Sequence, residues 1–222
     1  MDLMEAMRAR HSVRAYQNKP LDAGVKAELQ KAVDEVNRES GLHIQLITNE
    51  PKAFDSKLAH YGAFSGVTNY FALVGKKTAD LDEACGYYGE KLVLRAQQLG
   101  LRTCWVALTY QKIPGVFDIA PDEKLTVVIS VGYGANDGKP HKSKPAARVS
   151  NLDGASPAWF RRGVEAALLA PTAVNQQQFM LTRTGSTVAA KAKLGPCSKM
   201  DLGIVKYHFE LGAGKENFTW AK

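Results

Sequence analysis

The sequence predicts an α+β protein in which long helices alternate with short apolar strands. Residues 80–99 carry apolar side chains around most of the helical circumference and stop at Gly100, which predicts a long, buried helix. Residues 42–47 alternate apolar and polar side chains, as a half-buried strand does, whereas residues 70–75 are almost entirely apolar and predict a more buried strand. With 222 residues, the chain has room for one large domain or two small ones.

The other elements are predicted from the same helical and strand periodicities of apolar residues. The helix predicted at residues 22–38 has Asp22 as its N-cap and Gly41 just beyond its end. Before residue 135 we also expect a helix at 2–9, a short helix and irregular loop within 52–66, a short apolar segment at 103–108, a one-turn helix at 113–117, a strand at 125–131 and a turn at 132–134. After residue 157 we expect a helix at 158–169, a strand at 179–182, a helix at 201–211 and a closing edge strand at 216–220.

Between these two groups, residues 135–157 are rich in Gly, Pro, Lys and Ser. Such a composition is typical of a connector and makes this stretch the candidate boundary between residues 1–150 and residues 151–222. We nevertheless expect the two parts to form one compact unit.

An internal echo links the two parts. When Ala32 is aligned with Ala167 without gaps, Ile44 falls on Phe179, so that helix, loop and strand match in length. A second alignment places Gly86 on Gly203 and superimposes the apolar positions of the two helices that follow. A helix–strand–helix order therefore occurs twice, unless the match reflects only the general similarity of amphipathic segments.

The chain has 29 Lys and Arg against 22 Asp and Glu, a net charge of +7. A basic balance can indicate a nucleic-acid partner. However, the sequence contains no run of Lys and Arg, no nucleic-acid module and no aromatic residues interleaved with the charges. We expect a small anionic ligand and a basic surface instead, with no nucleic-acid partner.

The three cysteines, Cys85, Cys104 and Cys197, have neither CxxC nor metal-ligand spacing, so we expect no metal site. Two of them lie in apolar runs, as buried free thiols do in a reducing compartment. The first residues are too polar for a secretory signal, and no apolar run is long enough to span a membrane. We therefore expect a cytoplasmic protein without a membrane partner.

Three polar segments are candidates for a binding site. The segment Arg10-His11-Ser12-Val13-Arg14 places two guanidinium groups and a hydroxyl on alternate residues, which share one face of an extended chain and suit a phosphate. A second basic cluster, His141-Lys142-Ser143-Lys144, lies in the connector. The third, residues 170–178, offers Asn and Gln donors and acceptors that suit the edge of a heteroaromatic ring. Taken singly, each could equally be a solvated edge, a charged linker or ordinary helix capping.

Taken together, these segments resemble the FMN-dependent nitroreductase family. The resemblance rests on RHSVRAY near the start, on Gly86-Tyr87 leading into a helix that ends in LGLRTCWVA, on VVISVGYG, on KSKP and on APTAVNQQQF, which is similar to the family's APSxxNxQPW-type motif. It implies a nitroreductase-like fold, with a central mixed or antiparallel sheet flanked by helices, to which the internal echo adds a pseudo-two-fold repeat.

The resemblance also implies the site residues, all of them FMN contacts. Arg10 and Ser12, with His11 between them, would bind the phosphate and ribityl chain, and Arg14 would lie near the pyrimidine edge and stabilise the anionic reduced form. The remaining implied contacts are Lys142 and Lys144 at the phosphate, Val106, Ala107 and Leu108 at the reactive edge of the ring, and Pro171, Thr172, Asn175 and Gln177 closing over the ring from the other side.

The order of the motifs departs from the family. Typical members carry the APSxxNxQPW-type motif after the first long helix, where it contacts the partner subunit's flavin, but here residues 36–41 lack it and residues 170–179 carry it. We infer that a two-fold homodimer is condensed into one chain, with residues 151–222 as a partial second repeat that completes the FMN site. This favours a monomer with one flavin, although a homodimer is possible.

The implied activity is a ping-pong transfer of hydride from NADH or NADPH through FMN to a nitroaromatic, a quinone or a similar small-molecule acceptor. No side chain is implied as a catalytic group, because the cofactor carries the chemistry. We expect Asp82, Glu83 and Glu90 to form the charged start and exposed face of their helix rather than an acid–base site. The alternative is a flavin-binding sensor or carrier without turnover. The second half has little room for a helical roof over the substrate, so the acceptor is small or the site is open.

Overall fold

The computed structural model describes residues 1–221, which form two compact units. The central unit consists of residues 9–81 and 91–140, and the C-terminal unit consists of residues 1–8, 82–90 and 141–222. The mixture of helices and sheets confirms the predicted α+β class. Within the described residues, no helix is both long enough and apolar enough to cross a bilayer.

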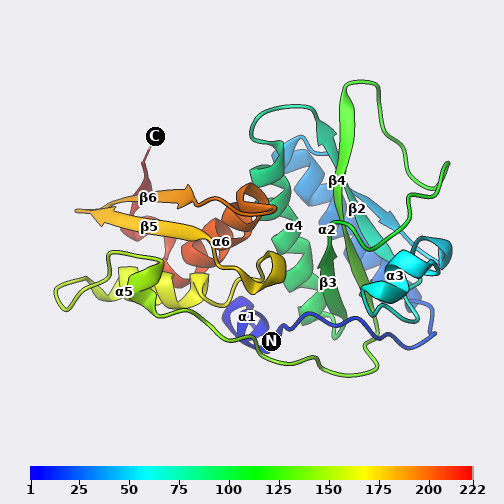
Figure 1. Ribbon diagram of the computed structural model, residues 1–222, viewed down its shortest axis with the longest axis horizontal. Helices are drawn as coiled ribbons and strands as arrows, with labels where there is room; N and C mark the ends of the chain where they lie inside the picture. Colours follow the sequence, from blue (N-terminus) through cyan, green and yellow to red (C-terminus); the bar gives the residue numbers. More distant parts are fainter. Residues whose placement is uncertain (222) are drawn as a thin grey trace. The chain divides into compact units, whose positions relative to one another are not determined.

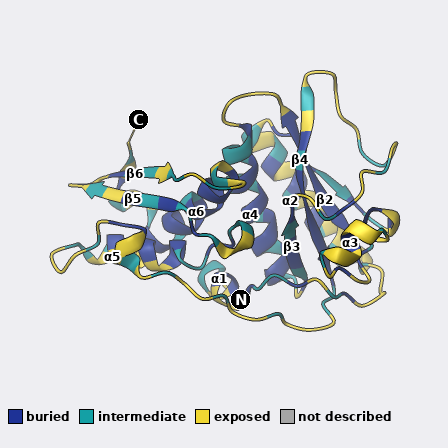
Figure 2. Ribbon diagram, in the orientation of Figure 1, coloured by how far each residue is buried: buried dark blue, intermediate teal, exposed yellow. Residues whose placement is uncertain are grey.

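The central unit is built on a four-stranded antiparallel sheet in the order β1-β2-β4-β3 (Figure 1). Its strands are β1 (Gln45–Ile47), β2 (Tyr70–Lys76), β3 (Arg102–Val106) and β4 (Glu123–Gly132). The inner strands β2 and β4 are almost entirely buried (Figure 2), because they bear apolar side chains on both faces. The strands predicted at 70–75 and 125–131 are confirmed, whereas only Gln45–Ile47 of the strand predicted at 42–47 is strand. The apolar segment at 103–108 proves to be mainly strand β3.

The helices of this unit are α2 (Ala23–Ser40) and α3 (Lys57–Tyr61), with a 3₁₀ turn, η1, at Lys52–Phe54. Helix α2 ends as predicted at Gly41, whose φ of 71° is the left-handed conformation that glycine adopts readily. Asp22 occupies the N-cap position, but its side chain makes no capping bond; its carboxylate accepts a hydrogen bond from the Tyr133 hydroxyl at 2.6 Å instead. The helix expected at 113–117 is wrong, because this stretch forms only turns and bends.

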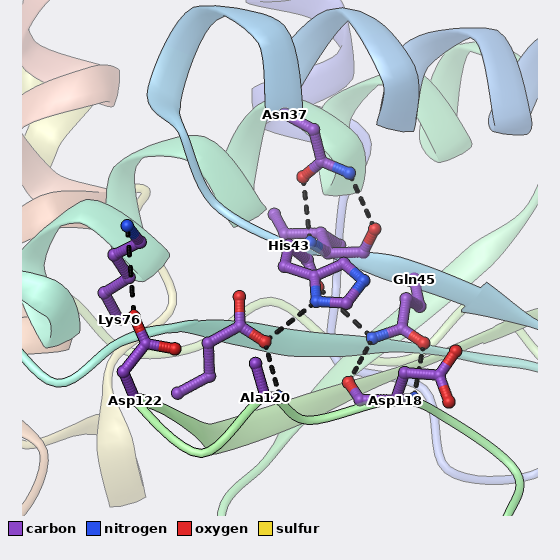
Figure 3. A network of polar contacts seen from close by, with 9 residues as sticks. Asn37, His43, Gln45, Lys76, Asp118, Ala120 and Asp122 are labelled. Carbon is purple, nitrogen blue, oxygen red and sulfur yellow. Dashed lines mark hydrogen bonds and ion pairs between the residues drawn. The ribbon is translucent and has the colours of Figure 1, made fainter.

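A polar network fastens the edge of this sheet to the loop before β4 (Figure 3). The His43 ring lies 3.0 Å from the Glu123 carboxylate, and Gln45 exchanges two hydrogen bonds of 2.8 Å with the backbone of Asp118. The hydrogen bond from His43 also lowers the pKa of Glu123. Asn37 makes two further bonds to the chain just before β1. The network explains how a three-residue edge strand is held in register.

The C-terminal unit has a three-stranded sheet in the order β5-β6-β7, packed on helices α5 and α6 (Figure 1). These elements are β5 (Phe179–Thr184), β6 (Thr187–Ala192), β7 (Thr219–Trp220), α5 (Ala158–Ala167) and α6 (Ser198–Ala213); the others are α1 (Leu3–Ala9) and the 3₁₀ turns η2 (Ala146–Arg148), η3 (Ala173–Asn175) and η4 (Lys215–Asn217). Both predicted helices and strand β5 are confirmed, but of the edge strand predicted at 216–220 only Thr219–Trp220 is strand, because the chain before it forms η4. Strand β6 was not predicted from the sequence.

Helix α4 (Leu81–Gln98) begins in the C-terminal unit, where it crosses α6 at two glycines. A Cβ atom at Gly86 would lie 2.0 Å from the carbonyl oxygen of Met200, and a Cβ atom at Gly203 would lie 2.0 Å from the carbonyl oxygen of Glu83. Each glycine thus meets the backbone three residues before the other. The helices approach this closely because neither carries a side chain at the crossing.

The glycine crossing matches the internal echo in the sequence. The offset of 117 residues that relates Gly86 to Gly203 also relates the first residue of β2 to that of β6 and the first residue of α4 to that of α6. The other offset in the echo, 135 residues, relates the start of α2 to the start of α5. The helix–strand–helix repeat is therefore present in the structure, while β3 and β4 have no counterpart in the second half.

The expectation that Glu90 lies on the exposed face of its helix is wrong. Its side chain is fully buried, and its carboxylate lies 2.9 Å from Nε2 of His208, which is also fully buried. The other ring nitrogen of His208 lies 3.2 Å from the carbonyl oxygen of Ala166, which can only accept a hydrogen bond. The pair joins α4, α5 and α6 inside the C-terminal unit.

Candidate functional site

The basic segment at residues 10–16 runs in an extended conformation between β3 and the loop that follows α3. On one side, the amide of Val13 donates to the carbonyl of Thr103 at 3.0 Å. On the other side, the backbone of Ser65 donates to Arg14 at 3.0 Å and accepts from Tyr16 at 2.9 Å. Backbone hydrogen bonds on both edges fix which side chains point where.

The structure brings Arg10, Ser12 and Arg14 together around the thiol of Cys104. Burial raises the pKa of Cys104, while the positive charges of Arg14 and Arg10 and a hydrogen bond from the Ser12 hydroxyl act in the opposite direction. Arg10 is only 4% exposed, whereas Arg14 is exposed and lies 5.8 Å from the ring centroid of Phe64. Two guanidinium groups and a hydroxyl on alternate residues therefore face a common region, as their spacing predicts.

His11 points elsewhere. Its Nδ1 atom lies 3.1 Å from the carbonyl oxygen of Asp137, in the loop after β4. The Asp137 carboxylate in turn accepts two hydrogen bonds from Arg102 on β3. Here His11 fixes the path of the basic segment.

The loop around Ser65 is part of this region, although no sequence pattern indicates it as a site. Gly66 has a φ of +67°, and a Cβ atom there would lie 2.3 Å from the carbonyl oxygen of Tyr16, so only glycine fits. The Tyr16 hydroxyl donates to the carbonyl of Val13 at 2.8 Å and shares a hydrogen bond of the same length with Ser130. Tyr16 thereby ties the basic segment to β4.

Residues 106–108 leave the end of β3 beside this loop. Val106 is buried and still paired with β4, whereas Ala107 is exposed and Leu108 is 80% exposed. The turn at Gly62 packs on the next residue: a Cβ atom there would lie 2.6 Å from the side chain of Thr109. The chain after β3 is therefore held in place while its apolar side chain at Leu108 remains accessible.

The remaining predicted site residues lie in the C-terminal unit, where they form a single hydrogen-bonded loop. Pro171 is buried just before η3, and Thr172 Oγ1 accepts from the amide of Gln177 at 3.0 Å. The side-chain amides of Asn175 and Gln177 both donate to the carbonyl of Lys142 at 2.9 Å. Gln177 also donates to the Asn175 side chain at 2.8 Å.

This loop is strained. Three residues that are not glycine, Val174, Asn175 and Gln177, have φ values of 46°, 55° and 45°. Asn tolerates the left-handed region, but a β-branched residue such as Val is a clear outlier there. Such conformations persist only where surrounding contacts enforce them, and they cluster at functional sites.

Lys144 is one of the residues that enforce this conformation. Its ammonium group donates to the carbonyl of Gln176 at 2.6 Å and to that of Gln177 at 3.3 Å, and its backbone amide donates to Oε1 of Gln177 at 2.8 Å. The structure thus places Lys144 against the loop, and Lys142 contributes its carbonyl oxygen.

Asp201, in the first turn of α6, is a further residue of this loop that the sequence did not indicate. Its side chain is 4% exposed, and its carboxylate accepts hydrogen bonds from the amide of Ala173 at 3.0 Å and from Nε2 of Gln176 at 2.8 Å. Burial raises the pKa of Asp201 to about 6, although these two hydrogen bonds act in the opposite direction. An aspartate early in a helix has a local explanation at the helix N-terminus, so nothing in the pattern indicates a contact with a loop.

Comparison with known proteins agrees with this reading of the sequence. Residues 2–213 match a family model described as "Putative TM nitroreductase". No curated protein sequence matches the chain.

Solved structures share the fold. A "putative nitroreductase" from Thermotoga maritima is 24% identical, with a TM-score of 0.69, and the match covers 97% of this chain and 85% of that one. Another, from Desulfovibrio desulfuricans in complex with FMN, is 16% identical, with a TM-score of 0.55 over 71% of this chain and 99% of its own. A "Putative NADH Oxidase" from Clostridium acetobutylicum is 19% identical, with a TM-score of 0.50 over 65% of this chain and 96% of its own. Because the family model spans almost the entire sequence, the chain belongs to this nitroreductase family and is an oxidoreductase.

Proposed function

We propose that the protein is an FMN-dependent oxidoreductase that takes electrons from NADH or NADPH and passes them, in a ping-pong cycle, to a nitroaromatic, a quinone or a similar small acceptor. The observation that carries this proposal is the convergence of Arg10, Ser12 and Arg14 on one region around Cys104. Family membership and the FMN-bound relative from Desulfovibrio desulfuricans support it.

The donor set fits a phosphate ester. Arg10 keeps its charge at any physiological pH and can donate two parallel hydrogen bonds to phosphate oxygens, and the Ser12 hydroxyl adds a third donor. Because Arg10 is nearly buried, its interaction with an anion is screened less than that of a surface arginine. We assign the phosphate and ribityl contacts to these residues.

Bound FMN would supply the capacity to accept and release a hydride, and the chain would supply position and charge. Arg14, which is exposed beside Phe64, would place a positive charge near the pyrimidine edge of the ring. Val106, Ala107 and Leu108 would face the reactive edge. The strained loop with Pro171, Thr172, Asn175 and Gln177 would close over the ring, while Lys142 and Lys144 hold that loop, with Lys144 also adding charge near the phosphate.

We further propose that one chain makes one complete site. The repeat and the reciprocal crossing of α4 and α6 are what a two-fold dimer interface looks like when both halves belong to one polypeptide. Residues 151–222 would then take the place of a partner subunit, and the protein would be a monomer. A homodimer of complete chains is compatible with the same site.

Cys85 and Cys104 are buried and form no disulfide, which suits a reducing compartment and supports a cytoplasmic location. The sequence does not indicate whether NADH or NADPH is the electron donor, since no GxGxxG nucleotide-binding motif is present. The acceptor would be small or the site open, because the second half is short.

An anaerobic titration tests the proposal. The purified protein should bind FMN, its visible absorbance should bleach with NADH or NADPH, and a quinone or a nitroaromatic should restore it. Arg10→Met should weaken FMN binding, whereas Arg38→Met, which removes an exposed arginine from α2, should not. A flavin that binds but resists both nucleotides would indicate a carrier or sensor and contradict the proposal.

A further inference from the structure

The strained loop is held between two opposite charges. On one side, the Lys144 ammonium donates hydrogen bonds to the carbonyl oxygens of Gln176 and Gln177. On the other side, the Asp201 carboxylate accepts hydrogen bonds from the amide of Ala173 and the side-chain amide of Gln176. A cation thus satisfies the loop's acceptors and an anion its donors. Hydrogen bonds to ionised groups are about twice as strong as those between neutral groups.

The conformation needs such support. An exposed valine in the left-handed region has no local reason to stay there: Val174 is 89% exposed, so packing does not hold it. Asn175 and Gln177 also depart from the ordinary backbone regions. The contacts that fix the loop therefore come from its neighbours, and Lys144 and Asp201 are the charged ones.

Asp201 is well placed to act as a fixed anchor. It lies on α6, its backbone amide donates to the carbonyl of Cys197 at 2.9 Å, and its side chain is almost inaccessible to water. Burial, followed by the charges of Asp201 and Asp82, raises the pKa of the nearby Cys197 thiol, and Lys199, two positions earlier in α6, is exposed. The carboxylate oxygens of Asp201 accept hydrogen bonds from Ala173 and Gln176, so they serve the loop.

We propose that Asp201 is a positioning residue: through Gln176 and Ala173, its carboxylate holds residues 172–177 in the conformation that contacts the flavin ring. This rests on the proposed function, in which the loop closes over FMN. Asp201 does not touch the cofactor in this account.

The role requires the ionised form. The amide of Ala173 donates to both carboxylate oxygens, at 3.0 Å and 3.1 Å, and Gln176 Nε2 donates to one of them at 2.8 Å. Gln176 Nε2 also donates to the carbonyl of Pro196 at 2.5 Å. A proton on the oxygen that faces Gln176 would point at the N–H group that now donates to it. The Gln176 side-chain amide could not rotate to offer its oxygen instead without losing its hydrogen bond to the Pro196 carbonyl. Protonation should therefore loosen the loop.

FMN affinity of Asp201→Ala and Asp201→Asn tests the proposal, with Asp153→Asn as the control. Asp153 is an exposed aspartate of the same unit whose carboxylate binds Ser156 and not the loop. We expect Asp201→Ala to weaken FMN binding at least tenfold, Asp201→Asn to weaken it less because one oxygen remains, and Asp153→Asn to leave it unchanged. The circular dichroism of each variant must match that of the parent protein. If Asp201→Ala is misfolded, Asp201→Asn alone decides.

Two further readouts separate positioning from a merely structural effect. Asp201→Ala and Gln176→Ala should be non-additive in FMN affinity, because they break the same contact. The FMN phosphate itself titrates near pH 6. The pH dependence of FMN affinity is therefore compared between the parent protein and Asp201→Asn, or measured with riboflavin, which has no phosphate. Affinity of the parent should fall below about pH 6 and that of Asp201→Asn should fall less.

Equal FMN affinity and equal pH dependence in the parent protein and both Asp201 variants would overturn the positioning role while leaving the proposed function intact. Failure of the parent protein to bind FMN would overturn the proposed function, and this role with it. The two failures are therefore distinguishable in one set of titrations.

Discussion

Gly86 and Gly203 make the same contact in opposite directions, each lying against the backbone three residues before the other. In a two-fold symmetric dimer, a residue i that touches j in the partner is matched by j touching i, which is the definition of an isologous contact. Here both partners belong to one chain and are separated by a constant offset. The relationship is the structural counterpart of the sequence repeat and the strongest support for a condensed dimer.

Substituting either glycine should destabilise the fold. Gly86→Ala and Gly203→Ala each force a Cβ atom to within 2.0 Å of a backbone carbonyl, so the helices must separate. We expect a loss of about 2–3 kcal/mol in the free energy of unfolding for each, measured in urea, as overpacked cores show. Gly24→Ala, in α2 with no atom near its Cβ position, should leave stability unchanged or slightly raised. Equal effects at all three positions would contradict the close crossing.

The buried pair Glu90–His208 should contribute far more than its exposed neighbour. His208→Leu removes the imidazole that lies 2.9 Å from a fully buried carboxylate and leaves that carboxylate without this partner, so we expect a loss of about 3–5 kcal/mol in unfolding free energy. Glu39→Gln breaks the ion pair with Lys91, the residue after Glu90 in α4. This substitution should lower the unfolding free energy by less than about 1 kcal/mol. Urea unfolding monitored by tryptophan fluorescence measures both, and similar losses would show that the pair is not buried.

Arg14 should influence the flavin's reduction potential more than its affinity. A positive charge near the pyrimidine edge stabilises the anion that reduction creates, so Arg14→Met should shift the midpoint potential negatively by about 30 mV, or about 1.4 kcal/mol for a two-electron couple. Equilibration with a dye of known potential measures the shift. Arg38→Met is the matched control, and a shift of equal size in that variant would argue against a local effect of Arg14.

Stability should also depend on pH through Asp201. Its pKa is about 6 in the folded protein against an ordinary value of 3.8, so between about pH 4 and pH 6 the folded state binds the proton that the unfolded state has lost. The free energy of unfolding should therefore fall as the pH rises through this window, by up to about 3 kcal/mol. Urea titrations at stepped pH should show this slope in the parent protein and lose most of it in Asp201→Asn.

The ionised carboxylate thus reduces stability while ordering the loop. Such a trade is expected where a strained segment serves binding. An Asp201→Asn variant that keeps the full slope would show that another group is responsible.

Much of the fold could be predicted from the sequence because its main elements have strong periodicity. The buried strands at 70–75 and 125–131 and the helix at 80–99 were located to within a few residues. The two glycines that the echo aligns, Gly86 and Gly203, prove to lie at the helix crossing, which the sequence alone did not predict. Strand β6 was missed because Thr187–Ala192 has few large apolar residues, although the 117-residue offset from β2 points directly at it.

The candidate site likewise has a part that could be predicted from the sequence and a part that could not. The alternation of Arg10, Ser12 and Arg14 is local, so it could be predicted. The burial of Glu90 and the contact of Asp201 with the polar loop could not, since both depend on residues more than twenty positions away. The role of Lys144 in supporting the loop is likewise a tertiary contact that charge alone does not reveal.

The FMN content per chain, measured together with the molecular mass in solution, decides whether one polypeptide forms one complete flavin site. Absorbance gives the flavin concentration, amino-acid analysis gives the protein concentration, and light scattering gives the mass of the particle that carries the flavin. We expect one FMN per polypeptide, on a particle of 24.2 kDa. A ratio near two would contradict one site per chain, and flavin found only on particles of twice that mass would contradict the monomer.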